Sequence, residues 1–314
     1  MNVQDKHIVE FIGDGFVKVA PDTSLLEASL SAGIRHMHVC GGKGQCSTCR
    51  VLVLESGELL SAPTEKEKIL NSQMNFDLNV RLACQTRVKG ESVKLKRIIQ
   101  DESDIKLYVG KTAELSSNQI GEEVELVLFF FDIRNFTDFT QSHLAFDVIH
   151  IVRKLFSNFH AIIQKNNGEI IETMGDGFYA IFGCEKGNTA GVQAAIDAAV
   201  EILKDMERLN KNYFVPYFNE IIEVGIGVHI GKVISGKIRL GTVERSFAMG
   251  LPVNIAARLQ NATKELNNNF LVSAEACNYL PVTSKLYPST SVKLKGITDE
   301  VNVFLFGKSF LNKS

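Results

Sequence analysis

The chain has 314 residues, of which 45% are hydrophobic and 22% are charged, and this composition argues against an intrinsically disordered protein. The formal net charge of −2 is that of a chain without a strongly basic surface, so we expect no nucleic-acid partner. No apolar run reaches the roughly 18 residues that a membrane-spanning helix needs, so we expect no transmembrane segment. The length is sufficient for two domains.

The N-terminal residues MNVQDKHIVE do not have the charged-then-apolar pattern of a signal peptide, which predicts a cytoplasmic location. The six cysteines are then expected to stay reduced. Metal binding is therefore a better explanation for a group of cysteines than a disulfide framework.

Short strand-like segments dominate residues 1–100, which we predict to form one domain. The expected strands cover residues 7–11, 16–19, 51–54 and 93–95. One expected helix follows Pro21 and Asp22 over residues 24–32, and a second begins at Thr64. This arrangement predicts a small mixed sheet with one helix across it.

Residues 101–123 are polar and are predicted to be a linker, and long alternating elements fill residues 124–314. The expected strands are 126–131, 169–173, 178–182 and a pair at 223–230 and 232–235, and the expected helices are 143–165, 189–210 and 253–266. The order strand, helix, strand, strand, helix, strand is the βαββαβ pattern of ferredoxin-like folds. The predicted fold class of the whole chain is α+β.

Four cysteines in the first domain are the clearest sign of chemistry. Cys40, Cys46 and Cys49 are spaced C-x5-C-x2-C, and Cys84 follows in RLACQ. Four thiolates complete the tetrahedral shells of the two irons in a 2Fe-2S cluster. The glycines of CGGKGQCSTC permit the close backbone approach that such a cluster needs.

Three other kinds of site explain these cysteines less well than the cluster does. A zinc ribbon usually has two C-x2-C pairs, and Cys84 has no nearby partner in sequence. A redox-active dithiol of Cys46 and Cys49 would leave the other two cysteines unexplained. Rieske ligation needs two histidines among the ligands, and His36 and His38 do not have that spacing. The cluster is the interpretation that uses all four cysteines.

Two aspartates lie at the ends of predicted strands in the second domain. Asp132 follows the apolar run of FFFDIRNFT, and Asp176 is at the tip of the hairpin in ETMGDGFY. Adjacent central strands of the predicted fold would bring the two carboxylates together. A pair of this kind could hold two Mg²⁺ ions for in-line attack at phosphorus. Taken alone, each aspartate is equally well explained as a turn residue.

A polar pair occurs on a predicted helix in LPVNIAARL. Asn254 and Arg258 are four residues apart and therefore share one face of the helix. Arg258 could stabilise a charged phosphoryl transition state, and Asn254 could fix a ribose close to the reacting oxygen. The alternative for the pair alone is a solvated helix face.

These motifs carry two family resemblances. Residues from about 7 to 99 resemble 2Fe-2S ferredoxins of the vertebrate-type and bacterial biosynthetic family, through CGGKGQCSTCRV and RLACQ, which implies a β-grasp fold. Residues from about 124 to 306 resemble class III adenylate/guanylate cyclases. That resemblance implies that Asp132, Asp176 and the carbonyl of Ile133 bind two Mg²⁺ or Mn²⁺ ions, and that Asn254 and Arg258 contact the transition state.

The cyclase resemblance also implies nucleotide-binding residues and a homodimer with active sites at its interface. Lys295, in VKLKGI, corresponds to the triphosphate-binding lysine of the family, and Phe136 and Thr137 lie in its nucleotide-binding segment. Arg239 or Arg245 is a candidate contact for the polyphosphate.

Two positions associated with base selection, Glu172 and Phe247, do not carry the residues that are usual in adenylate-making members of the family. Glu172 matches the residue of guanylate-making members, since a carboxylate can accept hydrogen bonds from guanine. Phe247 matches neither specificity class and offers no polar group for reading a base. Because bacterial-type members often depart at these positions, the resemblance favours ATP, with GTP as the alternative.

The predicted function is therefore an adenylate cyclase regulated by the redox state of a 2Fe-2S cluster, acting with a redox partner that the sequence does not identify. A guanylate cyclase is the first alternative. The second is an electron-transfer protein with an inactive cyclase-like dimerisation module. A diguanylate cyclase is disfavoured because the sequence has no GGDEF-like segment.

Overall fold

The computed structural model describes residues 7–100, 121–183, 187–240 and 243–311. The chain divides into two compact units, Met1–Ile120 and Gly121–Ser314. Residues 101–120, which make up most of the predicted linker, lie outside the described residues. Among the residues described, no helix is both long enough and apolar enough to span a bilayer.

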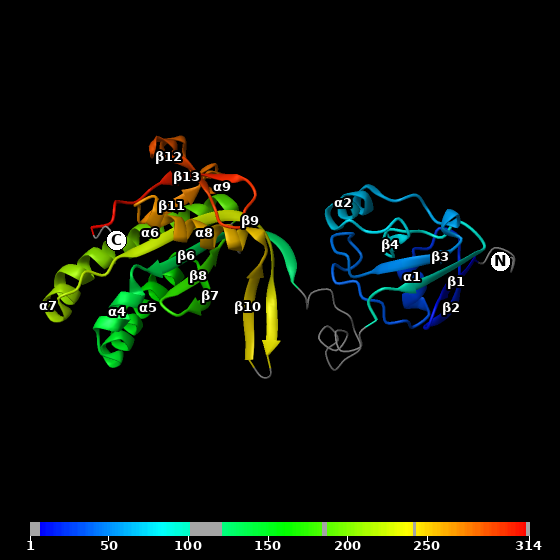
Figure 1. Cartoon of the computed structure of the whole chain (residues 1–314), viewed down its shortest axis with the longest axis horizontal. Coiled ribbons are helices and arrows are strands. Elements are labelled where there is room, and N and C mark those ends of the chain that lie inside the picture. Colours follow the sequence, from blue (N-terminus) through cyan, green and yellow to red (C-terminus); the bar gives the residue numbers. More distant parts are fainter. Residues whose placement is uncertain (1–6, 101–120, 184–186, 241–242, 312–314) are drawn as a thin grey trace. The chain divides into compact units, whose positions relative to one another are not determined.

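The N-terminal unit has the β-grasp arrangement predicted from the sequence (Figure 1). Its elements are β1 (His7–Phe11), β2 (Gly15–Val19), α1 (Leu25–Ser31), β3 (Arg50–Glu55), η1 (Gly57–Leu59), α2 (Glu65–Met74), β4 (Val80–Leu82) and β5 (Ser92–Arg97). In the described part, the sheet order is β2-β1-β5-β3-β4. β1 pairs with β5 in parallel, and its other neighbour, β2, is antiparallel.

Capping residues determine where the two helices of this unit begin. Ser24 caps α1 and Thr64 caps α2, each through a capping box with the glutamate three residues later. The buried side of α1 packs against the sheet residues Val9, Phe11 and Leu95. The loop of residues 40–49 lies between α1 and β3, and both of these elements belong to this packed core.

The C-terminal unit is built on a larger mixed sheet. Its strands are β6 (Glu122–Ile133), β7 (Glu169–Met174), β8 (Gly177–Phe182), β9 (Val224–Leu240), β10 (Val243–Met249), β11 (Phe270–Ser273), β12 (Ser289–Lys293) and β13 (Glu300–Leu305). Within the described residues the order is β12-β13-β11-β9-β6-β8-β7, and β10 pairs with β9. The predicted βαββαβ order is present in β6, α5, β7, β8, α6 and β9.

Helices cover both faces of this sheet. They are α4 (Phe136–Ser142), α5 (Ala145–Lys165), α6 (Asn188–Leu209), η3 (Asn210–Phe214), α7 (Val215–Phe218), α8 (Leu251–Glu265), α9 (Ala274–Cys277) and η4 (Val282–Leu286). α5 and α6 pack on one face, where Phe129 and Phe131 of β6 belong to their core. α8 packs on the other face, where Ala256 meets Leu128 and Phe130. The alternating side chains of β6 thus serve two separate cores.

Two sequence predictions about strands are wrong in detail. The expected strand pair at 223–230 and 232–235 is one continuous strand, β9, and its hairpin partner is β10. Gly231 is not a turn residue; a Cβ there would lie 2.6 Å from Pro252, so glycine lets α8 pack directly on the strand. β6 begins at Glu122, inside the predicted linker, because Glu122 still pairs with Ser235 of β9.

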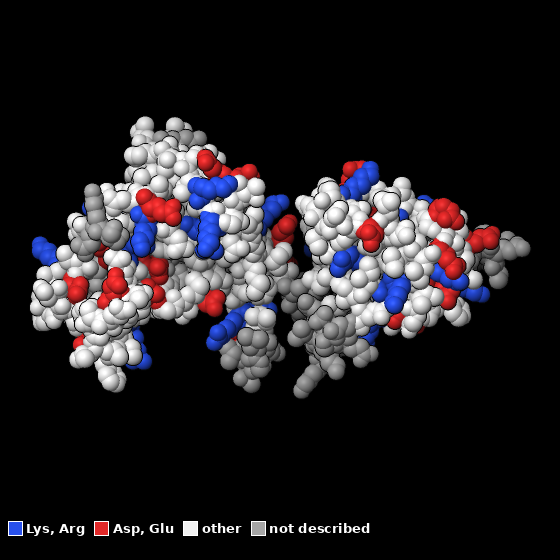
Figure 2. Space-filling view, viewed as in Figure 1, with Lys and Arg blue, Asp and Glu red and all other residues white. Residues whose placement is uncertain are grey.

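Charged side chains are mixed in sign on the surface. On the face shown in Figure 2, the coloured Lys and Arg groups are interspersed with Asp and Glu over both units. This distribution agrees with the net charge of −2 and contains no broad basic area on that face.

Candidate functional site

The four cysteines of the N-terminal unit lie around one loop. Cys40, Cys46 and Cys49 belong to the segment between α1 and β3, and Cys84 follows β4. The backbone N–H groups of residues 43, 45 and 46 donate to the sulfur of Cys40, and that of Gly44 donates to the sulfur of Cys84. Inward-pointing N–H groups stabilise thiolates, which are the form of cysteine that binds metals.

The sulfurs stand in two pairs. The Sγ atoms of Cys49 and Cys84 are 3.5 Å apart, and the Cys40 and Cys46 thiols are also hydrogen-bonded. A hydrogen bond from Cys46 lowers the pKa of Cys40 to about 4, and one from Cys49 lowers that of Cys84 to about 7. The same bonds raise the pKa values of the donors, Cys46 and Cys49, above the usual thiol range. In each pair, one sulfur is thus favoured as the thiolate by the hydrogen bond from its neighbour.

This arrangement fits a two-iron cluster. In the described residues, no group of three or more ligand side chains surrounds a single point. Two pairs of thiols meet the need of a 2Fe-2S cluster, because each iron takes two cysteine ligands beside the bridging sulfides. A structural zinc ion needs four ligands around one centre, which fits the two pairs less well.

Polar side chains outside the cysteine motif support the loop. Gln85 donates from Nε2 to the carbonyl of Gly42 at 3.3 Å, and Lys66 donates from Nζ to the carbonyl of Lys43 at 2.9 Å. The buried carboxylate of Glu67 accepts from Arg81, in an ion pair of 3.1 Å, and from the backbone N–H of residue 82. None of these supporting residues was predicted from the sequence, although the polar ends of RLACQ, Arg81 and Gln85, were a signal for two of them.

In the C-terminal unit, the structure brings Asp132 and Asp176 together. Asp132 lies near the end of β6, and Asp176 lies in the turn between β7 and β8. β6 and β8 are antiparallel with Phe131 opposite Phe178, so the strand end faces the turn. The two carboxyl groups are close enough to interact directly.

Gly177 makes this approach feasible. A Cβ at this position would lie 2.6 Å from the carbonyl oxygen of Phe131 and 2.9 Å from Oδ1 of Asp132. Any other residue would therefore push β8 away from the end of β6. The second glycine of the GDG segment is thus explained by packing, which sequence reasoning did not resolve.

The carboxylate pair has the electrostatics of a cation site. Burial, and then the nearby charge of Asp176, raise the pKa of Asp132 to about 7. Burial also raises the pKa of Asp176. Two half-buried carboxylates in contact are unfavourable when both are charged, and a divalent cation would remove that cost. Hard oxygen ligands suit Mg²⁺ or Mn²⁺. Ile133 is buried at the same end of β6.

Asn254 and Arg258 lie in the first half of α8, on its exposed side. Ala256 and Leu259 bury the opposite side against the sheet. Within the described chain, neither polar side chain makes a hydrogen bond or ion pair with Asp132 or Asp176. The structure therefore presents the pair at a surface, separate from the carboxylates of the same chain.

The two base-selection candidates lie on different strands: Glu172 is in β7, which pairs with β8, and Phe247 is in β10, which pairs with β9. Glu172 is exposed and sits at an irregularity in β7 opposite Tyr179. Phe247, in β10, pairs with Gly236, and its ring is close enough that a Cβ on Gly236 would lie 3.2 Å away. Phe247 is thus held by packing, whereas Glu172 is open to a ligand.

The remaining candidates are dispersed over the surface of the unit. Phe136, the first residue of α4, packs against the core, and Thr137 beside it is exposed. Lys295 and Arg245 are exposed. The side chain of Arg239 lies outside the described residues.

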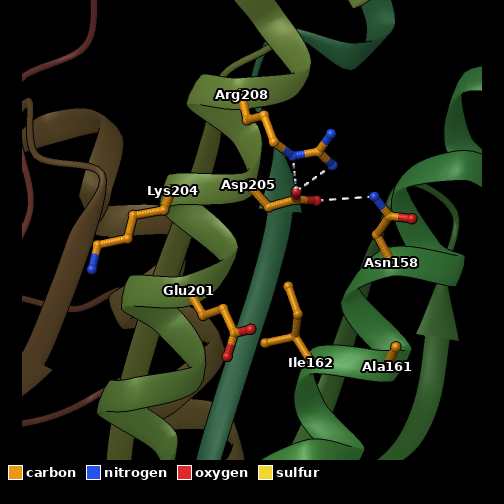
Figure 3. A pocket seen from close by; sticks show the side chains of 7 residues that line it. All are labelled: Asn158, Ala161, Ile162, Glu201, Lys204, Asp205 and Arg208. Atoms are coloured by element: carbon orange, nitrogen blue, oxygen red, sulfur yellow. Dashed lines mark hydrogen bonds and ion pairs between the residues drawn. The ribbon is translucent and has the colours of Figure 1, made fainter.

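A shallow hollow lies between α5 and α6, and its polar side chains serve to hold the two helices together (Figure 3). Asp205 accepts from Arg208 at 2.6 Å and from Asn158 at 2.9 Å. Glu201 accepts from Lys165 at 2.7 Å. Because both carboxylates accept hydrogen bonds from donors on α5 and α6, we interpret the residues of the hollow as polar contacts that join the two helices.

Comparison with known proteins gives two family matches and several relatives. The model described as "Adenylate and Guanylate cyclase catalytic domain" matches residues 119–307, and the model described as "2Fe-2S iron-sulfur cluster binding domain" matches residues 12–89. The chain is 25% identical over 227 residues to receptor-type guanylate cyclase gcy-19 of Caenorhabditis briggsae, which covers 70% of this chain and 18% of that protein. It is 23% identical over 180 residues to adenylate cyclase 1 of Rhizobium meliloti (strain 1021), covering 57% and 27%.

A solved structure supports the same fold. The adenylyl cyclase CyaB from P. aeruginosa matches with a TM-score of 0.52 and 22% identity, over 58% of this chain and 93% of that one. The chain spans less than a third of the length of the two curated relatives. Since the cyclase model matches more than half of its residues, the chain belongs to the family of adenylate and guanylate cyclase catalytic domains, and a 2Fe-2S iron-sulfur cluster binding domain precedes that catalytic domain.

Proposed function

We propose that the protein is a nucleotide cyclase that converts ATP to 3′,5′-cyclic AMP and pyrophosphate. The observation that carries this proposal is the contact between the carboxyl groups of Asp132 and Asp176 at one edge of the sheet. The presence of Asn254 and Arg258 on one helix supports the proposal, because these two polar residues could contact the ribose and the phosphate.

Each residue has a role that its chemistry suggests. Asp132, Asp176 and the carbonyl of Ile133 would hold two divalent cations, which stabilise the ribose 3′-oxygen as an alkoxide and neutralise the phosphates when bound. Asn254 would orient the ribose so that its 3′-oxygen faces the α-phosphorus. Arg258 would bind the charge that develops on the α-phosphate as pyrophosphate leaves. Lys295 would bind the triphosphate, as would Arg245 or Arg239, and the segment of Phe136 and Thr137 would contact the nucleotide.

The active form is proposed to be a homodimer. Asn254 and Arg258 are exposed and do not contact the aspartates of their own chain within the described residues. A second copy could present its Asn254 and Arg258 to the Asp132 and Asp176 of the first. A symmetric dimer would then contain two equivalent sites.

Base selection leaves a specific second candidate, a guanylate cyclase. The exposed carboxylate of Glu172 can accept hydrogen bonds from guanine N1 and its amino group. Turnover of ATP and GTP should be compared with Mg²⁺ and with Mn²⁺, and GTP turnover equal to or above ATP turnover would reject the adenylate assignment. We expect Glu172→Lys to shift the ATP-to-GTP ratio toward ATP by about tenfold. Glu169→Lys, another exposed glutamate of β7, serves as the matched control.

We further propose that the state of the cluster regulates the cyclase. The chain that follows β5 is hydrogen-bonded to the residue that follows the cysteine loop. The N–H of Ile98 donates to the carbonyl of Arg50 at 3.1 Å, and Arg50 directly follows Cys49. Arg97, one residue earlier, pairs with Asp14 and donates to the carbonyl of Arg35 at 2.6 Å. Through these hydrogen bonds, a change of charge or order in the cysteine loop would alter the position of the residues that precede the linker.

Anaerobically purified protein provides the test of this regulation. Cyclic nucleotide formation should differ among oxidised, reduced and cluster-free protein. Equal rates in all three states would reject regulation and leave the cyclase assignment in place. A protein with an intact cluster but without cyclase activity would support the alternative, an electron-transfer protein with an inactive cyclase-like module.

A further inference from the structure

The chain beyond β13 passes the starts of β11 and β9 and is held by three consecutive asparagines, Asn267–Asn269. Their side-chain oxygens accept hydrogen bonds from the backbone N–H groups of Gly307, Lys308 and Phe310, at 3.1, 2.8 and 3.2 Å. A Cβ at Gly307 would lie 2.6 Å from the backbone nitrogen of Phe270, so glycine is needed where the chain turns onto this edge. The segment Gly307–Leu311, called the strap below, is thus fixed along its length.

The far end of the strap reaches the strand that carries Asp132. The N–H of Leu311 donates to Oε1 of Glu223 at 2.7 Å. The carbonyl of Glu223 in turn accepts from the N–H of Arg134 at 2.8 Å. The guanidinium of Arg134 lies over the ring of Phe310, 5.1 Å from its centroid. The strap therefore contacts the residue two positions after Asp132.

The charge of Arg134 acts on carboxylates on two sides. It interacts electrostatically with Asp132 and with Glu223. A cation that moves toward Asp132 opposes the binding of a divalent cation there, because like charges repel strongly in a half-buried site. The ring of Phe310 packs against the guanidinium, and the charge of Glu223 attracts it. The family match ends at residue 307, so most of the strap lies outside it.

We propose that the strap fixes Arg134 beside the carboxylate pair and thereby determines how tightly Asp132 and Asp176 take a divalent cation. This inference rests on the metal-binding role in the proposed function. Arg134 and Phe310 are positioning residues, since they act through the two aspartates.

The test is direct binding of Mn²⁺, measured by the loss of the free Mn²⁺ signal in electron paramagnetic resonance. Asp132→Asn defines the binding that does not belong to the site. We expect Phe310→Ala to weaken site-specific binding about three- to tenfold, the range of a lost cation–π contact. Phe310→Tyr, which keeps an aromatic face, should bind as the wild type does. Phe146→Ala removes a phenylalanine that is 87% exposed at the start of α5 and should change nothing.

The double variant Arg134→Ala/Phe310→Ala decides whether Arg134 is the intermediary. Compared with Arg134→Ala alone, it should bind Mn²⁺ within about twofold, because the ring then has no guanidinium to hold. Equal Mn²⁺ affinity of Phe310→Ala and wild type would overturn the proposal. A loss of Mn²⁺ affinity on Phe310→Ala that persists in the Arg134→Ala background would also overturn it. So would the absence of any Mn²⁺ binding that depends on Asp132. Wild-type protein that binds Mn²⁺ at Asp132 but forms no cyclic nucleotide would reject the proposed activity and not the strap.

Discussion

The two units of this chain assemble their candidate metal sites in different ways. In the N-terminal unit, Cys40, Cys46 and Cys49 come from one loop, and backbone N–H groups of the same loop stabilise the sulfurs. In the C-terminal unit, Asp132 and Asp176 come from separate strands and meet only through the register of β6 and β8. One site depends on local chain geometry, and the other depends on long-range packing.

The difference explains the chemistry of each site. A loop rich in glycine can wrap its N–H groups around soft sulfur ligands, as Gly44 does toward Cys84. The paired strands β6 and β8 hold two hard carboxylates at fixed positions, and hard oxygen ligands suit divalent cations such as Mg²⁺. Each site should therefore keep its own ligands in place when the other site loses one, and the predictions below test how each site is built.

The largest expected effect is the loss of the cluster in Cys84→Ser. Removing one of four thiolates should abolish the visible absorbance and the bound iron of anaerobically purified protein. Cys277→Ala removes a buried cysteine of the other unit and should retain both signals. Retention of a full cluster by Cys84→Ser would contradict the assignment of its ligands.

Asp132→Asn should lower cyclic nucleotide formation by about a thousandfold, because a lost metal ligand costs several kcal/mol of transition-state stabilisation. The visible spectrum of the cluster should not change. Asp77→Asn, at an exposed aspartate of the N-terminal unit, is the matched control and should keep wild-type activity. An active Asp132→Asn protein would show that the carboxylate pair is a structural feature of the turn.

Arg258→Ala should lower the rate by about a hundredfold, the range for removing one group that contacts a developing charge. A mixture of this protein with Asp132→Asn tests where the site is formed. If each site combines two chains, half of the randomly mixed dimers contain one intact site, and activity should recover to about a quarter of wild type. No recovery after subunit exchange would indicate that each chain forms its own site.

The smallest effect concerns a buried histidine in each unit. His36 donates to or accepts from Ser29 at 2.9 Å, and His229 does the same with Ser273 at 2.8 Å. Burial lowers the pKa of each to about 4 from 6.5. The unfolded chain then binds the proton more readily, so stability is full above pH 6.5 and falls as the pH decreases toward 4.

For His229, the loss between pH 7 and pH 5 should be about 2 kcal/mol in the free energy of unfolding. His229→Gln should remove that part of the pH dependence in the C-terminal unit, while the N-terminal unit keeps its own. Chemical denaturation at the two pH values measures the difference. His160→Gln, at an exposed position, should leave the pH dependence as it is in the wild type. An unchanged pH dependence in His229→Gln would mean that His229 is not the responsible group.

Much of the local structure could be predicted from the sequence. β1 has the predicted bounds, and the predicted helix start at Thr64 is the capping residue of α2. Such features depend on neighbouring residues, so they are present in the sequence itself. The extent of β9 could not be predicted, because Gly231 resembles a turn residue until Pro252 is known to pack against it.

The sequence by itself determined both domain families and led to the prediction of four cysteine ligands, since spacing within short motifs carries that information. Only the tertiary structure decided that the thiols stand in two pairs, that Asp132 contacts Asp176, and that Asn254 and Arg258 face outward. It also decided that Phe310 lies under Arg134, 176 positions earlier in the chain. These contacts join residues far apart in sequence, and they follow from sheet register and packing, which no local pattern encodes.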